Sequence, residues 1–135
     1  MANKAYAKGY RFEREVFKLF SSSGFYVIRS SGSHGVFDLL AVKDGIAYGI
    51  QAKYNNHIST IEKQAMINCY ETYGIIPLYV YRMKGKPIQI VCLLNNKVIK
   101  PEELTRINEI CGNAHVKKLI KLNGGGKGES GRSTA

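Results

Sequence analysis

Residues 35–54 read GVFDLLAVKDGIAYGIQAKY, and this stretch decides the predicted fold. Two apolar, β-prone runs flank Asp44-Gly45, and an Asp-Gly pair between alternating runs is the strongest short signal for a β-hairpin. A two-residue turn at this pair places Lys43 opposite Ile46, and the pairing continues outward one residue at a time. The stretch therefore predicts two antiparallel strands in a fixed register.

The polar side chains of this hairpin gather at the end away from its turn. The same register places Asp38 opposite Gln51, and opposed residues share a face of the sheet. Because strand side chains alternate with period two, Lys53 joins that face. We therefore expect a carboxylate, an amide and an ammonium group to converge there.

These groups suit phosphate chemistry with a divalent metal. Mg²⁺ prefers hard oxygen ligands, so Asp38 can bind it directly and the Gln51 carbonyl can supply a second oxygen. The Lys53 ammonium can orient an attacking water and stabilise negative charge on a phosphate. The alternative interpretation is structural, a salt bridge between Asp38 and Lys53 at the strand edge.

The rest of the chain predicts further elements around the hairpin. Helical spacing of apolar residues indicates a first helix over about 7–22, with Glu13 at the border of its buried face. A second helix begins near Ser59, because Ser59 and Glu62 form a capping-box pattern, and it ends at Gly74. The remaining expected elements are strands at 25–29, 77–82 and 88–94 and a helix at 101–111. This order predicts an α/β fold, or an α+β one, with a mixed central sheet of about five strands flanked by helices.

The charge of the chain points to an anionic partner. Twenty Lys and Arg face ten Asp and Glu, which gives a formal net charge of +10. Nucleic acid is the commonest partner of such a surface, and a basic surface that serves only solubility is the alternative. The chain shows no phosphate-loop pattern, so nucleotide hydrolysis is disfavoured.

Composition also indicates where the protein works. Cys69, Cys92 and Cys111 are odd in number and form no CxxC pair, so we expect three reduced thiols, with no zinc site and no disulfide. No apolar run approaches the ~20 residues of a membrane span. The polar, basic N-terminus lacks the pattern of a signal peptide. We expect a cytoplasmic protein with no membrane partner, either microbial or, if a virus encodes it, in the host cytoplasm. Residues 1–122 are expected to form one folded domain, and 123–135 are an expected disordered Gly/Ser-rich tail.

The order of these features resembles a known group of enzymes. Asp38, followed by Gln51-Ala52-Lys53 on the next strand and preceded by a helix with Glu13, looks like the PD-(D/E)xK nuclease superfamily. The segments KGYRFEREVFKLF, GFYVIRSSGS, FDLLAV and GIIPLYVYR resemble archaeal-type Holliday junction resolvases over about residues 8–82. The resemblance implies a restriction-endonuclease-like core and a DNA endonuclease that cuts four-way junctions.

The resemblance also implies roles for particular residues. Glu13, Asp38 and Gln51 would hold Mg²⁺, for which Mn²⁺ could substitute, and Lys53 would be the catalytic lysine. Arg29 matches an arginine beside the phosphate backbone. The other expected DNA contacts are Ser30 and His34 in the loop after it and Lys8, Arg11 and Arg14 on the first helix. Such enzymes are homodimers that nick two opposed strands of branched DNA, with no small-molecule cofactor. We place the dimer surface on apolar residues of the second helix and the final strands.

The chain departs from the family pattern at the hairpin. The family residue at Gln51 is usually glutamate, so metal affinity should fall unless Glu13 compensates, although related restriction-type nucleases carry glutamine there. Phe37 stands where the motif has proline, and the loop from Ser33 to Asp38 is about one residue longer. Two alternative functions therefore stay open. One is a restriction-like or repair endonuclease on duplex DNA, and the other is a catalytically decayed protein that binds junctions.

Overall fold

The computed structural model describes residues 4–30 and 35–111, with side chains from Lys8 onward. The predicted tail at 123–135 and the boundary at 122 lie outside these residues. The elements in chain order are α1 (Lys4–Ser22), β1 (Tyr26–Arg29), β2 (Leu39–Lys43), β3 (Ile46–Tyr54), α2 (Thr60–Tyr73), β4 (Ile76–Arg82), β5 (Gln89–Cys92), β6 (Lys97–Ile99), the 3₁₀ helix η1 (Pro101–Arg106) and α3 (Ile107–Ile110).

The strands form one mixed sheet in the order β1-β2-β3-β4-β5-β6. Strands β3 and β4 are parallel, and every other neighbouring pair is antiparallel. A parallel pair needs a crossover, and α2 supplies it. The predicted fold class is confirmed, with six strands in place of about five. The additional strand β6 has only 3 residues, too few for a recognisable alternation in the sequence.

The predicted hairpin register is confirmed from the turn as far as Leu39 and Ile50. Lys43 pairs with Ile46, and the pairing runs outward to Leu39 with Ile50. Asp38 lies just beyond the paired residues, and its N–H donates to the Ile50 carbonyl at 2.8 Å, so the predicted Asp38–Gln51 pair is not part of the ladder. Asp44 and Gly45 have φ of 53° and 78°, the left-handed pair that a tight hairpin turn requires.

The helix α2 begins and ends where the sequence indicates. The Ser59 hydroxyl accepts the Glu62 N–H, and the Glu62 side chain accepts the Ser59 N–H, so both halves of the capping box are present. Gly74 ends the helix with φ of 76°, a left-handed conformation that costs glycine little. The cap fixes the start of α2 just beyond the end of β3, close to the predicted site.

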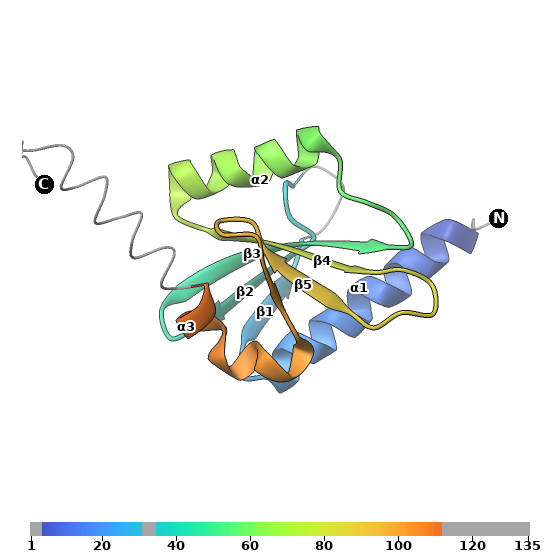
Figure 1. The fold of residues 1–135 in the computed structure, drawn as a ribbon, viewed down its shortest axis with the longest axis horizontal. Coiled ribbons are helices and arrows are strands. Elements are labelled where there is room, and N and C mark those ends of the chain that lie inside the picture. Colours follow the sequence, from blue (N-terminus) through green and yellow to red (C-terminus); the bar gives the residue numbers. More distant parts are fainter. Residues whose placement is uncertain (1–3, 31–34, 112–135) are drawn as a thin grey trace, which may run out of the picture.

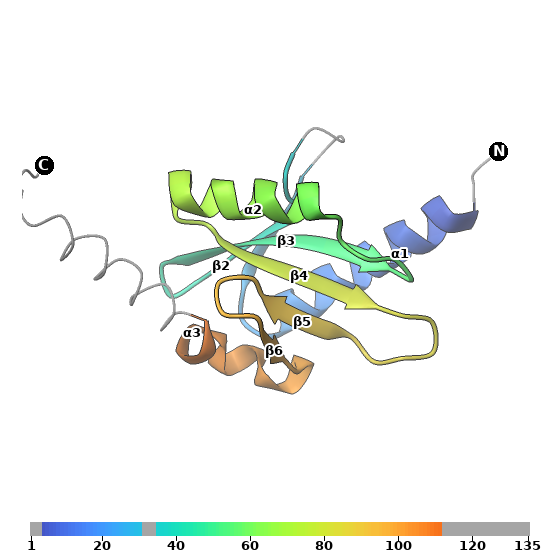
Figure 2. The same cartoon turned by 45° about the horizontal axis from the view of Figure 1, so that its top comes forward.

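Helices cover both faces of the sheet (Figures 1 and 2). The larger core lies on the face shared by α1 and the η1–α3 segment, and it includes Phe12, Val16, Leu39, Ile50, Leu78 and Ile107. A smaller cluster on the α2 face contains Met66, Tyr79 and Leu93, with Phe37 packed against it. The side chains of Gln51 and Lys53 lie on this second face, because they alternate with Ile50, which is in the larger core, and Ala52, which packs against it. No helix in the described part of the chain is long and apolar enough to cross a membrane.

Two expectations for the C-terminal part are wrong. The segment at 101–111 is a 3₁₀ helix followed by a short α-helix rather than one continuous helix. Cys92 and Cys111 form a disulfide and are fully buried, whereas Cys69 is free. The two bonded cysteines are 19 residues apart in sequence, and only the return of η1–α3 across the sheet brings them together.

Candidate active site

Asp38 is fixed by both its backbone and its side chain. Its carboxylate Oδ2 accepts the Ala52 N–H at 2.8 Å, and its carbonyl accepts the Ser30 N–H at 2.9 Å. The residue stands just before β2, where the ladder with β3 ends. Asp38 therefore connects β1, β2 and β3 at the edge that the sequence predicts for the site.

Phe37, the residue before Asp38, lies over a glycine of the neighbouring strand. A Cβ added to Gly49 would come within 2.5 Å of the Phe37 ring, closer than real Cβ atoms approach any group. The absence of a side chain at Gly49 thus lets the Phe37 ring pack flat on β3. This contact sets the position of the chain directly before Asp38.

Gln51 has a defined amide orientation. Its Nε2 donates to the Val36 carbonyl at 2.8 Å. Because the amide nitrogen makes this bond, the carbonyl oxygen Oε1 points the other way and keeps its acceptor capacity. The segment at Val36 is thereby tied to β3 beside Asp38.

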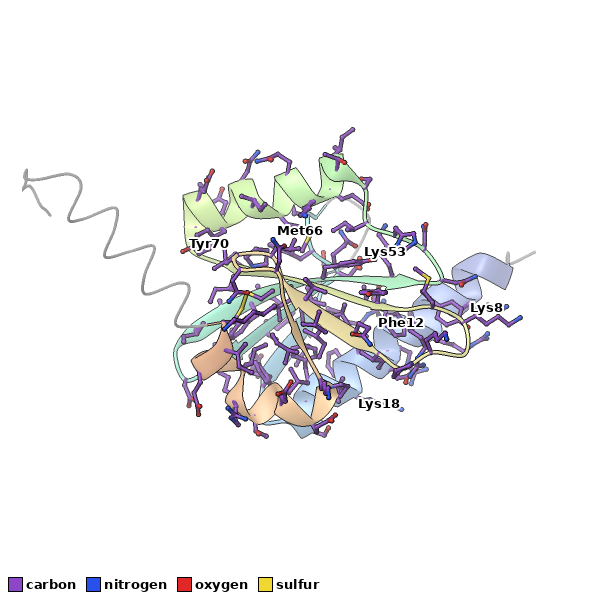
Figure 3. All side chains as sticks on the ribbon, in the orientation of Figure 1. Lys8, Phe12, Lys18, Lys53, Met66 and Tyr70 are labelled. Atoms are coloured by element: carbon purple, nitrogen blue, oxygen red, sulfur yellow. A yellow bond between two sulfur atoms is a disulfide. The ribbon has the colours of Figure 1, made fainter. Side chains whose placement is uncertain are left out.

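Lys53 pairs with a residue that the sequence interpretation did not place in the site. Its Nζ lies 2.7 Å from the Oε2 of Glu62, so the alternative Asp38–Lys53 salt bridge is wrong. Figure 3 shows Lys53 on the α2 side of the sheet and Phe12 on the α1 side. The sequence marked Glu62 only as a helix cap. A signal for its second role was its position nine residues after Lys53, at the start of the next helix.

Glu13 comes from the helix on the other face of the sheet. Its Oε1 accepts the Arg29 Nε at 2.9 Å, which joins α1 to the end of β1. The structure therefore gives Glu13 an arginine as its partner, and the charge of Glu13 still acts on Asp38. The two side chains approach the same end of the sheet from different elements.

The electrostatics of the site centre on Asp38. Burial is the main cause that raises the pKa of the Asp38 carboxyl above its ordinary value. The negative charges of Glu13 and Glu62 raise this pKa further, whereas the Ala52 N–H and the Lys53 ammonium lower it. A carboxylate held in this way gains from a cation beside it.

The predicted DNA contacts fall into two groups around α1. The guanidinium carbons of Arg14 and Arg29 lie 6.0 and 4.9 Å from the centre of the Tyr10 ring. These three residues, with Phe17 and Lys18, line a pocket of about 240 Å³. Its three cations beside an aromatic surface suit a phosphate backbone.

The second group lies on another face of the same helix. Lys8 and Arg11 line a pocket of about 180 Å³ whose other lining residues are Phe12, Glu15, Tyr54 and Arg82. Arg82 makes two hydrogen bonds to Glu15, at 2.9 and 2.8 Å, so most of its charge is offset. Ser30 lies beside Asp38, and His34 lies outside the described residues. The sequence interpretation missed Lys18 and Arg82 as neighbours of these groups.

The oxygen atoms at the free end of the hairpin provide some of the ligands that a hard cation needs. Asp38 offers a carboxylate and Gln51 a carbonyl oxygen, and Mg²⁺ is commonly bound through one or two carboxylates with its waters retained. Among residues 4–30 and 35–111, no three His, Cys, Asp or Glu side chains come together as a metal-binding group. The residues present therefore fit a magnesium ion that keeps several waters, without a cage of protein ligands.

Comparison with known proteins decides the family. A family model described as "Archaeal holliday junction resolvase (hjc)" matches residues 4–124. The chain belongs to this family. A curated relative in the Hjc family, the crossover junction endodeoxyribonuclease Hjc of Methanocaldococcus jannaschii, is 34% identical over 89 residues, which are 63% of this chain. The match spans 66% of that Hjc protein's own length, just under two thirds.

A solved structure supports the same fold. The structure of Hjc from Archaeoglobus fulgidus, a Holliday junction resolvase from an archaeal hyperthermophile, matches with a TM-score of 0.57. The alignment covers 78% of this chain and 96% of that Hjc chain at 19% identity. At this identity the likeness bears on the fold alone, and it confirms the fold class that the sequence predicts.

Proposed function

We propose that the protein is a structure-selective endonuclease that resolves four-way DNA junctions by hydrolysing phosphodiester bonds. One observation carries the proposal. In a chain of the Hjc family, Asp38 stands at the free end of one hairpin and its Oδ2 accepts the Ala52 N–H, which places it beside Gln51 and Lys53 on either side of Ala52. The basic pockets on α1 would supply surfaces for the DNA backbone.

The proposed chemistry is in-line attack of water on the phosphorus. Asp38 and Gln51 are the residues that would hold Mg²⁺ or Mn²⁺, which when bound lowers the pKa of water and neutralises phosphoryl oxygens. The Lys53 ammonium, held beside the site, orients the water and stabilises the charge that develops on the phosphate. Arg29 and Ser30 lie where they can hold the backbone next to the cut. The proton of the attacking water passes to solvent, and the products are ligatable ends.

Glu13 has a different role in this proposal. Its carboxylate accepts a hydrogen bond from Arg29, so we assign it first to the placement of that arginine beside the DNA backbone. It becomes a metal ligand only if DNA draws the Arg29 guanidinium away. This two-state role follows from the fact that a phosphate and Glu13 compete for the same donor.

We further propose that the enzyme works as a homodimer in the cytoplasm. Two opposed nicks need two sites, and one chain carries one proposed site. The side chains of Ile61 and Tyr73 on the outer surface of α2 are 83% and 72% exposed, which supports this helix as the dimer surface. In a reducing cytoplasm the Cys92–Cys111 disulfide would be protected by its full burial.

One rival function has an observation in its favour. Gln51 is neutral, Glu13 is paired with Arg29, and no group of three metal-binding side chains forms within the described residues. These features fit a protein that binds junctions without cutting them. Such a protein would leave the junction intact in every divalent metal.

The test is cleavage of an end-labelled four-way junction in Mg²⁺ beside a linear duplex with the same arm sequence. Symmetric nicks in opposed strands, absent from the duplex, would support the resolvase. Equal cutting of junction and duplex would instead favour a restriction-like or repair enzyme. Binding with no cut, in Mn²⁺ as well, would favour the decayed junction-binding protein.

A further inference from the structure

Glu62 contacts the proposed catalytic lysine in addition to its role in the capping box of α2. Its Oε2 lies 2.7 Å from the Lys53 Nζ, and its Oε1 accepts the Ser59 N–H at 3.0 Å. Each carboxylate oxygen thus has its own partner. The carboxylate is fixed by the backbone at the start of α2 before it meets the lysine.

This arrangement differs from an ordinary surface ion pair. Pairs of two long, exposed side chains contribute little, because both chains must be ordered in solvent. Here the side chains of Lys53 and Glu62 are only 21% and 33% exposed. Burial by itself would raise the pKa of Glu62, but the hydrogen bonds from Lys53 and Ser59 outweigh it and lower this pKa. The carboxylate is therefore charged and oriented toward the ammonium at neutral pH.

A lysine needs such support if its ammonium is to act at a fixed point. Its four-carbon side chain has free rotation at each bond, and a displacement of about 1 Å from the reacting atoms can cost roughly 10²-fold in rate. Asp38 does not hold Lys53, since its Oδ2 bonds to the Ala52 N–H. Gln51, two residues before Lys53 on the same strand, is neutral. Glu62 is the acid that reaches Lys53, and its charge is also felt at Asp38.

We propose that Glu62 is a positioning residue that holds the Lys53 ammonium beside the scissile phosphate. It links the rigid start of α2 to the site and supplies the negative charge that neutral Gln51 lacks. This proposal rests on the proposed function only where it gives Lys53 a role in cutting. Whether Glu62 holds Lys53 is a separate property that can be measured by itself.

Two variants separate positioning from capping. Glutamine serves as well as glutamate in a capping box. Glu62→Gln therefore keeps the helix cap and removes the charge that holds Lys53. Ser59→Ala does the reverse, because it removes the hydroxyl that accepts the Glu62 N–H and leaves the contact with Lys53 in place.

Both variants are compared with the wild type for junction cleavage, junction binding and thermal unfolding. For Glu62→Gln we expect kcat to fall roughly 10- to 100-fold, while KM, and the Kd for the junction without divalent metal, stay within about two-fold. Its Tm should stay close to that of the wild type. For Ser59→Ala we expect a lower Tm with wild-type kcat at a temperature where the protein is folded. Wild-type kcat for Glu62→Gln, or equal losses in both variants, would overturn the proposal.

A second measurement does not depend on cutting. In ¹H–¹⁵N spectra, a lysine ammonium gives a sharp signal when it is held in an ion pair, and Lys53→Met identifies the signal of Lys53. We expect this signal in the wild type and in Ser59→Ala, and its loss in Glu62→Gln. A signal that persists in Glu62→Gln would contradict the holding of Lys53 by Glu62. A wild type that shows the signal but cuts no junction would refute the proposed function alone.

Discussion

The Phe37 ring lies on the backbone of Gly49, so close that a single added Cβ would come within 2.5 Å of it. The contact joins the residue before Asp38 to the strand that carries Gln51 and Lys53. It explains why Phe37, in place of the proline of the family motif, can precede the acid. The site depends on this packing as well as on the hairpin register.

Gly49→Ala should therefore displace Asp38 without unfolding the protein. Overpacking of this kind costs about 1–3 kcal/mol of stability. We expect junction cleavage to fall roughly 10²-fold, because the carboxylate moves with Phe37. The matched control is Gly9→Ala on α1, where a Cβ meets nothing within 4 Å. That control should cut normally and be more stable by about 0.5–1 kcal/mol. Normal cutting by Gly49→Ala would show that the contact with Phe37 does not position the site.

Asp38 should lower the stability of the metal-free protein. Its pKa is raised in the folded state, mainly by burial, so folding binds a proton between the unfolded and folded pKa values. Stability is then lost as pH rises through that window. We expect Asp38→Asn to be more stable by about 1 kcal/mol at neutral pH in chelator, from urea unfolding.

The pH dependence provides the check on this gain. The difference from wild type should shrink as pH falls toward about 4, the ordinary pKa of an aspartate. Exposed Glu102→Gln serves as the control and should show no gain at neutral pH. A less stable Asp38→Asn at neutral pH would mean that the charged carboxylate stabilises the fold.

Gln51→Glu should retain cutting and reach its maximal rate at a lower Mg²⁺ concentration. A second carboxylate strengthens the attraction for the metal. The substitution also removes the donor to the Val36 carbonyl, so without metal we expect a loss of about 1–2 kcal/mol in stability. Cleavage across a Mg²⁺ titration, with unfolding in chelator, measures both effects. A complete loss of cutting would show that the neutral amide is required and that our account of the metal ligands is wrong.

The Cys92–Cys111 disulfide should contribute strongly to stability. A cross-link that closes a loop of this length is worth about 3 kcal/mol in the chain-entropy description. The double variant Cys92→Ser with Cys111→Ser should lose about this much in urea unfolding. Cys69→Ser should lose much less, because Cys69 is free. Thiol titration of the denatured, unreduced wild type should find one free thiol. Three free thiols would show that the cysteines are reduced.

Local signals in the sequence account for the parts of the fold that were predicted. The Asp44-Gly45 turn fixes the hairpin register by itself, and the Ser59 capping box and Gly74 fix the ends of α2. These devices involve residues close together in the chain. Gln51 and Lys53 could be placed on one face for the same reason, whereas Asp38 lies beyond the paired residues and is held by the Ala52 N–H.

The contacts that the sequence did not predict join residues that are far apart in the chain, or involve a residue that has two roles. The disulfide depends on the return of η1–α3 over the sheet, which no local pattern encodes. Glu62 has a local role in the capping box through one carboxylate oxygen, and its second oxygen pairs with Lys53. Glu13 was expected beside the metal, but its bond to Arg29 depends on how α1 crosses β1.

The most direct test of the account is to compare Asp38→Asn with Asp44→Asn, at opposite ends of the same hairpin. Asn-Gly is as good a turn as Asp-Gly, so the second variant should cut junctions like the wild type. For Asp38→Asn we predict a loss of roughly 10³-fold in junction cleavage in Mg²⁺, with the Kd for the junction within about two-fold of wild type. Undiminished cutting by Asp38→Asn would contradict the assignment of the active site to this end of the hairpin.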